Sequence, residues 1–293
     1  MILDYPKIKE NELYFAYILR YHRYLGGSSL GQTFRYFMQK QYRPVSVIFP
    51  AGIEKSLAEI RMSPDMYVNA HSVLPYYRIF FREADYRNVV PETVVGSFPH
   101  TRRILNNQGK GTGEKQESLW YCPVCHAKRR DYDDIRIYHQ IPEVHVCPEH
   151  HCYLKQISVR ESKVLAEPES WDIGVEMCED VWLNGIAEDV RYIMEKKPEI
   201  FADAFCDAYW SWFEECADAV PFKSWNGWEA WINGEVNGLP EIYRTEFEDF
   251  RFRDYLHKEN TAKFKRIEYL VLIRMMYGSF EGFVGKLRQD GVL

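Results

Sequence analysis

The sequence predicts a mainly α protein, with a helix-turn-helix-like N-terminal module that carries a small cysteine-containing ribbon and is followed by an all-helical domain. Three observations support this fold class. Apolar residues recur at helical spacing through residues 11–72 and again beyond residue 171. A compact group of cysteines and histidines separates the two helical regions. The chain has 293 residues, which is more than one small hydrophobic core requires.

The N-terminal region begins with two predicted helices. Asn11 is a plausible N-cap for the first, and Phe15 and Ile18 follow at helical spacing. Gly26 and Gly27 predict its end, because glycine readily adopts the left-handed conformation that stops a helix. A second amphipathic helix follows this stop.

A helix-turn-helix candidate spans residues 53–72. Ser63, Pro64 and Asp65 form a strong helix start, with an N-cap, a proline in the first turn and an acid near the positive helix end. Two short helices joined by this tight turn match the motif's layout. An ordinary helical hairpin remains the alternative, because the expected second helix, residues 64–71, contains no Arg or Lys.

The predicted domain organisation has two parts. A helical front at residues 1–104 and the ribbon at 119–155 form the first domain, residues 1–157. A polar linker precedes a helical C-terminal domain at residues 172–293. In that domain Tyr243–Leu256 and Ala262–Tyr277 are expected to be helices, the second ended by a glycine.

Charge divides the chain in the same place. The net charge is −6, yet residues 1–160 carry 22 basic and 16 acidic side chains, whereas the remainder carries 15 and 27. A basic front suggests contact with phosphate, and an unevenly charged, solvated surface is the alternative. The sequence has no apolar run long enough to span a membrane, and its first residues lack a basic segment followed by an apolar one, so we expect no secretion signal. With seven cysteines, an odd number, we expect a reducing, cytoplasmic location.

Two short motifs predict a metal site. Cys122-Pro-Val-Cys125 and Cys147-Pro-Glu-His150 are separated by 21 residues. Each such turn directs two side chains at one point, and two turns complete a tetrahedron of thiolate and imidazole ligands, which Zn²⁺ favours. A closed set of four ligands predicts one structural zinc ion whose binding is coupled to folding.

The fourth ligand has neighbours of suitable chemistry. His151 and Cys152 are possible substitutes, but His150 keeps the Cys-x2-His spacing. A redox Cys-x2-Cys motif is the alternative for the first pair, although it would not require the second pair. Between the pairs, Ile135–Tyr138 and Val144–Val146 are expected to be short strands of the ribbon.

Basic residues flank the predicted zinc module. Lys128, Arg129 and Arg130 follow the first cysteine pair, and Arg102 and Arg103 precede the module. These five residues are candidates for contact with a nucleic-acid backbone. A solvated rim is the alternative, because three nearby aspartates would partly neutralise it.

Three stretches of this chain resemble the TniQ family, which includes TnsD. Tyr5 to His22 is similar to the family's opening segment, and Ile53 to Tyr77 resembles a second segment that contains its His-Thr-x-x-Pro motif, with Ser72 in place of Thr. The most specific match is Trp120 to Leu154, which resembles the family's zinc signature. Together these stretches cover about the first 155 residues, and the back half resembles, more weakly, the helical continuation of longer TnsD-like members.

The resemblance implies a role in transposition. Family members select the insertion target by recognising an attachment-site DNA or, in CRISPR-associated transposons, a guide-RNA effector complex. They then recruit an AAA+ ATPase regulator, which brings in the transposase. The resemblance implies that this chain is a non-enzymatic adaptor with those partners, and the absence of a long apolar run leads us to expect no membrane partner.

Two other functions remain open at this point. One is a zinc-ribbon and helix-turn-helix DNA-binding regulator that has no ATPase partner. The other is a zinc-containing nuclease, in which His139, Asp131, Asp133 and Asp134 would form a metal-dependent site. The sequence contains no recognisable nuclease motif, and the aspartates are typical of a solvated loop.

Overall fold

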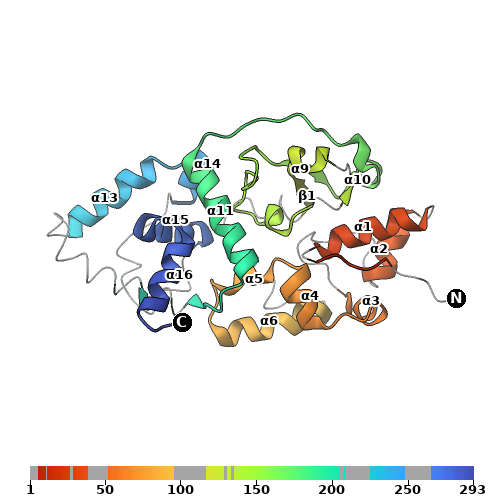
Figure 1. The fold of residues 1–293 in the computed structure, drawn as a ribbon, viewed down its shortest axis with the longest axis horizontal. Helices are drawn as coiled ribbons and strands as arrows, with labels where there is room; N and C mark the ends of the chain where they lie inside the picture. Colours follow the sequence, from red (N-terminus) through yellow and green to blue (C-terminus); the bar gives the residue numbers. More distant parts are fainter. Residues whose placement is uncertain are drawn as a thin grey trace.

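The structure of the protein is a computed structural model, and its helices dominate the fold (Figure 1). It describes residues 6–10, 12–26, 29–38, 52–95, 117–128, 131–132, 135–202, 204, 207–208, 211, 225–247 and 265–293. Its front helices are α1 (Tyr14–Leu25), α2 (Leu30–Met38), α3 (Glu54–Glu59), α4 (Pro64–His71), α5 (Leu74–Arg78) and α6 (Glu83–Val95). The mainly α fold class is therefore confirmed.

Further elements form the cysteine-containing module and the C-terminal region. The module contains β1 (Ser118–Tyr121), α9 (Pro123–Ala127), the 3-10 helix η2 (Ile137–Gln140) and β2 (Lys155–Ser158), followed by α10 (Ser162–Ala166) and η3 (Pro168–Ser170). The C-terminal region contains α11 (Val181–Lys196), α13 (Trp225–Asn237), α14 (Glu241–Arg244), η4 (Thr245–Phe247), α15 (Arg266–Tyr277) and α16 (Phe280–Gln289).

Helix α1 lies in the core and starts later than the sequence predicts. Its N-cap is Leu13 rather than Asn11, which lies outside the described residues. The carboxylate of Glu12 accepts a hydrogen bond from the backbone of Lys9 and pairs with Arg20 at 2.8 Å, so this segment remains outside the helix. The helix ends at Gly26, whose φ of 65° confirms the predicted left-handed stop.

The predicted pair of short helices is present as α3 and α4. Ser63 caps α4 by accepting a 3.1 Å hydrogen bond from the backbone of Met66, and Pro64 occupies the first turn. At the end of α4 the buried His71 makes a 2.8 Å hydrogen bond through Nδ1 to the carbonyl oxygen of Glu12. The two helices are confirmed, whereas the helix-turn-helix motif and DNA recognition by it stay predictions.

The ribbon is built from strands other than those predicted. Strands β1 and β2 pair antiparallel, with Ser118 opposite Ser158 and Tyr121 opposite Lys155, and so close the module at its two ends. The predicted strand 135–138 was wrong over residues 137–138, which begin the 3-10 helix η2, and its extended part is reduced to one bridge, between Arg136 and Glu12. The predicted strand 144–146 is reduced to one bridge, between Val146 and Tyr153.

Helix α11 lies at the centre of the molecule, between the front elements and the C-terminal helices (Figure 1). It packs against α5 and η2 on one side and against α15 and α16 on the other. Arg78 at the end of α5 donates hydrogen bonds to the carbonyl oxygens of Lys197 and Pro198, at 2.5 and 2.8 Å, where α11 ends. The predicted division into two domains stays a prediction, and α11 provides the packing between the two parts.

A buried ion pair also joins the front and back regions. Glu143 and Arg266 are 8% and 3% exposed, and Nε of Arg266 lies 2.5 Å from the Glu143 carboxylate. Tyr76 donates a hydrogen bond to the same carboxylate at 2.9 Å, and Tyr243 donates one to the Glu143 carbonyl oxygen at 2.7 Å. The Arg266 guanidinium also lies 5.1 Å from the ring centre of Tyr77. We call these five residues the Glu143 cluster.

The C-terminal helices agree with the prediction in part. The predicted helix 262–277 is observed as α15, ended by Gly278 with a φ of 75°. The predicted helix 243–256 was wrong over Thr245–Phe247, which form the 3-10 turn η4, and residues 248–256 lie outside the described residues. Among the described helices, none combines the length and apolar character that spanning a membrane requires.

Candidate metal centre

Local backbone structure positions the first pair of cysteines. Cys122 follows β1 and is the N-cap of α9, so that its sulfur accepts a 3.4 Å hydrogen bond from the backbone N–H of Cys125. Pro123 at the first helical position favours this start, because its fixed φ suits a helix and it lacks an N–H group that would need a partner. The turn therefore places both sulfurs on one side of the chain.

A tight turn positions the second pair. The N–H of Cys147 donates to the carbonyl oxygen of Cys152 at 2.9 Å, and the N–H of His151 donates to the carbonyl oxygen of Cys147 at 2.8 Å. His151 adopts a positive φ of 50°, which completes the turn. Its ring is directed to the side-chain oxygen of Asn184 at 3.0 Å, whereas His150 faces the cysteines.

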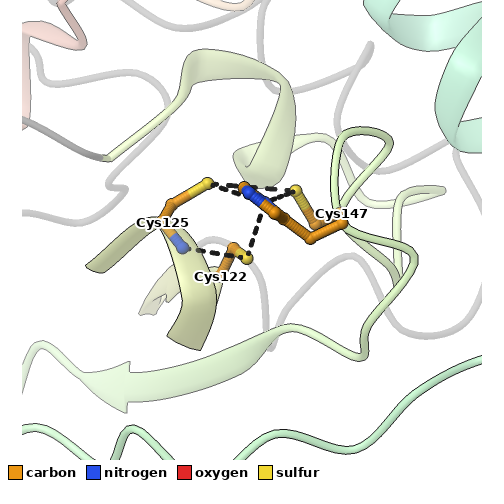
Figure 2. Close-up of side chains that lie close together, drawn as sticks. Cys122, Cys125 and Cys147 are labelled. Carbon is orange, nitrogen blue, oxygen red and sulfur yellow. Dashed lines mark hydrogen bonds between the residues drawn. The ribbon is translucent and has the colours of Figure 1, made fainter. Parts of the chain in front are cut away.

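The four predicted ligands meet at one point (Figure 2). Nδ1 of His150 lies 3.6 Å from the sulfur of Cys122, 3.3 Å from that of Cys125 and 3.4 Å from that of Cys147. The sulfurs of Cys125 and Cys147 are 4.0 Å apart, and all four ligand atoms lie within 4.8 Å of one another.

These separations fit a zinc ion. Tetrahedral Zn–S and Zn–N bonds of ordinary length require sulfur–nitrogen separations of about 3.6 Å and sulfur–sulfur separations of about 3.8 Å. Three thiols and one imidazole are also the donor types that zinc prefers over harder cations. The three cysteines are buried and His150 is half-buried, so the donors enclose the position between them. The cluster is thus able to hold a metal ion.

The crowded sulfurs perturb one another's protonation. The pKa of Cys122 is held far below its ordinary value because Cys125, and then Cys147 and Cys152, donate hydrogen bonds to its sulfur. The pKa of Cys147 is raised to about 12, first by its hydrogen bond to Cys122, and that of Cys125 is raised for the same reason. A bound cation would favour loss of the thiol protons.

A shell of aromatic and amide groups holds the module around the cluster. His126 bonds through Nε2 to the carbonyl oxygen of Pro168 at 2.8 Å and stacks on Trp171. The side chain of Gln140 makes two hydrogen bonds to the backbone of Trp120. Its oxygen accepts from the backbone N–H at 3.0 Å, and its nitrogen donates to the carbonyl oxygen at 2.7 Å. Gln140 lies in the stretch that resembles the family's zinc signature, whereas sequence reasoning missed Trp171, since no spacing signal marks a contact that the tertiary fold creates.

Cys152 lies directly beside the four ligands. It is buried, and its sulfur is 3.5 Å from that of Cys122. Since the other four donor atoms already complete a tetrahedron, Cys152 is placed to donate a hydrogen bond to the Cys122 sulfur. This arrangement favours His150 as the fourth ligand, as predicted.

Most of the candidate nucleic-acid-binding residues lie outside the described residues. Lys128 is exposed at the C-terminal end of α9. Arg102, Arg103, Arg129 and Arg130 lie outside the described residues. The basic patch therefore stays a prediction.

The two candidate nuclease residues that the structure describes, Asp131 and His139, do not form a common site. His139 is fully buried in η2, and Asp131 lies 3.9 Å from Arg23 of α1. Asp133 and Asp134 lie outside the described residues.

Comparison with known proteins identifies the part of the chain that holds this centre. The family model described as TniQ matches residues 5–154, just over half of the chain, and includes all four predicted ligands. A search of curated proteins gave no match.

Proposed function

The chain belongs to the TniQ family, whose domain is associated with the selection of transposition targets, and from this premise we propose that it is a non-enzymatic adaptor. In this proposal the chain engages the target, either DNA or a CRISPR effector ribonucleoprotein, and recruits the AAA+ ATPase of the transposon. The observation that carries the proposal is the closed Cys3His cluster within the segment that the family model matches.

The proposed metal is one structural zinc ion held by Cys122, Cys125, Cys147 and His150. When bound, it would supply a fixed link between the two turns of the module. Four protein donors leave no position for a reacting water molecule, so the site is suited to folding rather than to catalysis. The burial of the three cysteines supports the same role.

The charge distribution supports an adaptor with two different partners. The basic excess of residues 1–160 favours contact with phosphate, and the acidic remainder disfavours it. We assign target contact to Lys128, Arg129 and Arg130 together with Arg102 and Arg103. The ATPase would then contact another surface.

A pull-down of the cognate AAA+ ATPase by the full chain with ATP, under three conditions, namely without target, with target duplex and with the effector complex, tests the adaptor function. We expect recovery of the ATPase. Recovery that increases with the duplex would indicate that the chain reads DNA itself, and recovery that requires the effector complex would assign the ribonucleoprotein as target. Failure to recover the ATPase under all three conditions would contradict the adaptor function and favour a DNA-binding regulator.

A triple variant tests the basic patch separately. Replacing Lys128, Arg129 and Arg130 with alanine is expected to weaken binding to any duplex and to reduce its salt dependence, because each phosphate contact releases counterions. The matched control replaces the exposed Arg160 and Lys163, which lie beyond β2. Equal binding by the two variants would remove the patch from the target interface.

A further inference from the structure

The segment between η3 and α11 presents an exposed apolar edge. Figure 1 shows the chain after α10 crossing the edge of the cysteine-containing module as a long trace without helix. Ile173, Val175 and Met177 occupy alternate positions in it and are 37%, 50% and 61% exposed. Single exposed apolar side chains are ordinary, but three in five residues form a continuous strip.

One side of this segment is already attached to the metal-binding turn. Tyr153 donates its N–H to the carbonyl oxygen of Glu176 at 2.9 Å, and Cys178 donates its N–H to the carbonyl oxygen of His151 at 2.8 Å. Met177 is therefore paired with Cys152 in an antiparallel bridge. These bonds fix residues 176–178 as one antiparallel bridge at the edge of the module.

The other side of the segment is open. Within the described part of the chain, the N–H and carbonyl groups of Val175 and Met177 have no hydrogen-bond partner. In an antiparallel edge, successive residues direct these groups alternately to the two sides, so the unpaired groups of Val175 and Met177 lie opposite the bonds made by Glu176 and Cys178. Free backbone groups beside apolar side chains are the features that accept an added strand.

The charge around this edge defines the partner. Residues 164–190 contain eight acidic side chains and no Lys or Arg. Some of these acids are paired, as Asp172 is with Lys155, but Glu176 and Glu179 are exposed and have no ion pair among the described residues. Such a surface repels nucleic acid and attracts cationic groups.

We propose that residues 173–177 are a docking edge for an extended basic peptide segment of a protein partner, which adds as a strand along Val175 and Met177. Apolar side chains of the partner would cover Val175 and Met177, and its Lys or Arg side chains would face Glu176 and Glu179. This inference does not depend on the identity of the metal or of the transposition target.

The test measures fluorescence anisotropy of a labelled peptide added to the full chain. The probe is the octapeptide Lys-Val-Arg-Val-Lys-Ile-Arg-Ser, and its matched partner replaces every basic residue with Glu or Asp. The basic peptide is expected to bind and the acidic one is not. Equal binding of the two would overturn the charge assignment, and no binding of the basic peptide at about millimolar concentration would overturn the docking edge.

A proline substitution separates edge binding from general attraction to the acidic surface. Val175→Pro removes the free N–H without removing either bond to the metal-binding turn, and is expected to weaken binding about tenfold. Val181→Pro is the matched control, because Val181 is 77% exposed and begins α11, where proline is tolerated. Equal peptide affinity in the two variants would overturn the proposal.

Hydrogen exchange on the unaltered chain provides a measurement that does not depend on a variant folding. The basic peptide is expected to slow exchange at the amides of Val175 and Met177. Protection confined to another part of the chain would place the peptide elsewhere and overturn the proposal.

Discussion

Two buried polar groups of residues hold this molecule together, and they differ in how far they reach along the chain. The candidate metal centre joins four side chains within residues 122–150, and its parts lie in one module. The Glu143 cluster joins residues 76, 77, 143, 243 and 266, and so connects the front helices, the module and the C-terminal helices. The proposed metal therefore stabilises one module, whereas an ion pair attaches that module to the front and C-terminal helices.

The largest expected effect separates the two groups directly. Cys147→Ser should abolish stoichiometric zinc binding and unfold residues 117–158, because structural zinc sites contribute about 10–16 kcal/mol of binding free energy in small modules. Zinc content and thermal melting measure this effect. Cys178→Ser is the control, since Cys178 is also buried but lies outside the cluster. Full zinc content with unchanged melting in Cys147→Ser would refute the ligand assignment.

The second effect belongs to the Glu143 cluster. Arg266→Met leaves the buried Glu143 carboxylate without its cation and should lower the free energy of unfolding by about 3–5 kcal/mol, while the zinc content stays unchanged. Chemical denaturation measures this loss. The matched control is Arg160→Met, whose exposed pair with Glu117 contributes about 0–1 kcal/mol. Similar losses in the two variants would mean that burial adds nothing to the Glu143–Arg266 pair.

A smaller effect tests the periphery of the same cluster. Tyr243→Phe removes only the hydroxyl group that donates to the carbonyl oxygen of Glu143. The cost should be about 1–3 kcal/mol, because a buried carbonyl group loses its partner. Combining Tyr243→Phe with Arg266→Met should give a loss smaller than the sum, because both side chains act on Glu143. Strict additivity would show that the two contacts are independent.

The smallest effect concerns helix α11, which packs between the two regions. Asp180 caps it by accepting a 2.9 Å hydrogen bond from the backbone of Leu183. Asp180→Ala should cost about 1 kcal/mol, and Asp180→Asn should cost much less because asparagine retains the accepting oxygen. Equal losses measured by denaturation would indicate that the charge, rather than the hydrogen bond, stabilises the helix.

The difference in reach also explains what could be predicted from the sequence. The metal centre could be predicted because Cys122, Cys125, Cys147 and His150 sit at spacings that local turns bring together. The end of α1 at Gly26 and the start of α4 at Ser63 were predictable for the same reason, because backbone conformation and capping are local properties.

Features that depend on distant partners could not be predicted. Residues 135–138 have the composition of a strand, yet β1 pairs with β2, Arg136 forms a single bridge with Glu12, and the chain turns into a 3-10 helix at Ile137. The pairing of Glu143 with Arg266 spans 123 residues and follows no spacing rule. Composition marks both residues as surface charges, and only the packing of α15 against the rest of the fold buries them.

The hydrogen bonds from Arg78 to the end of α11 have a mechanical consequence. A single attachment would leave the C-terminal region free to rotate relative to the front helices. Arg78 donates hydrogen bonds to the carbonyl oxygens of Lys197 and Pro198. Arg266 forms a second attachment by its hydrogen bond to the Glu143 carboxylate. Rotation of the C-terminal region relative to the front helices would therefore have to break one of these attachments or the packing of α11 against α5 and η2.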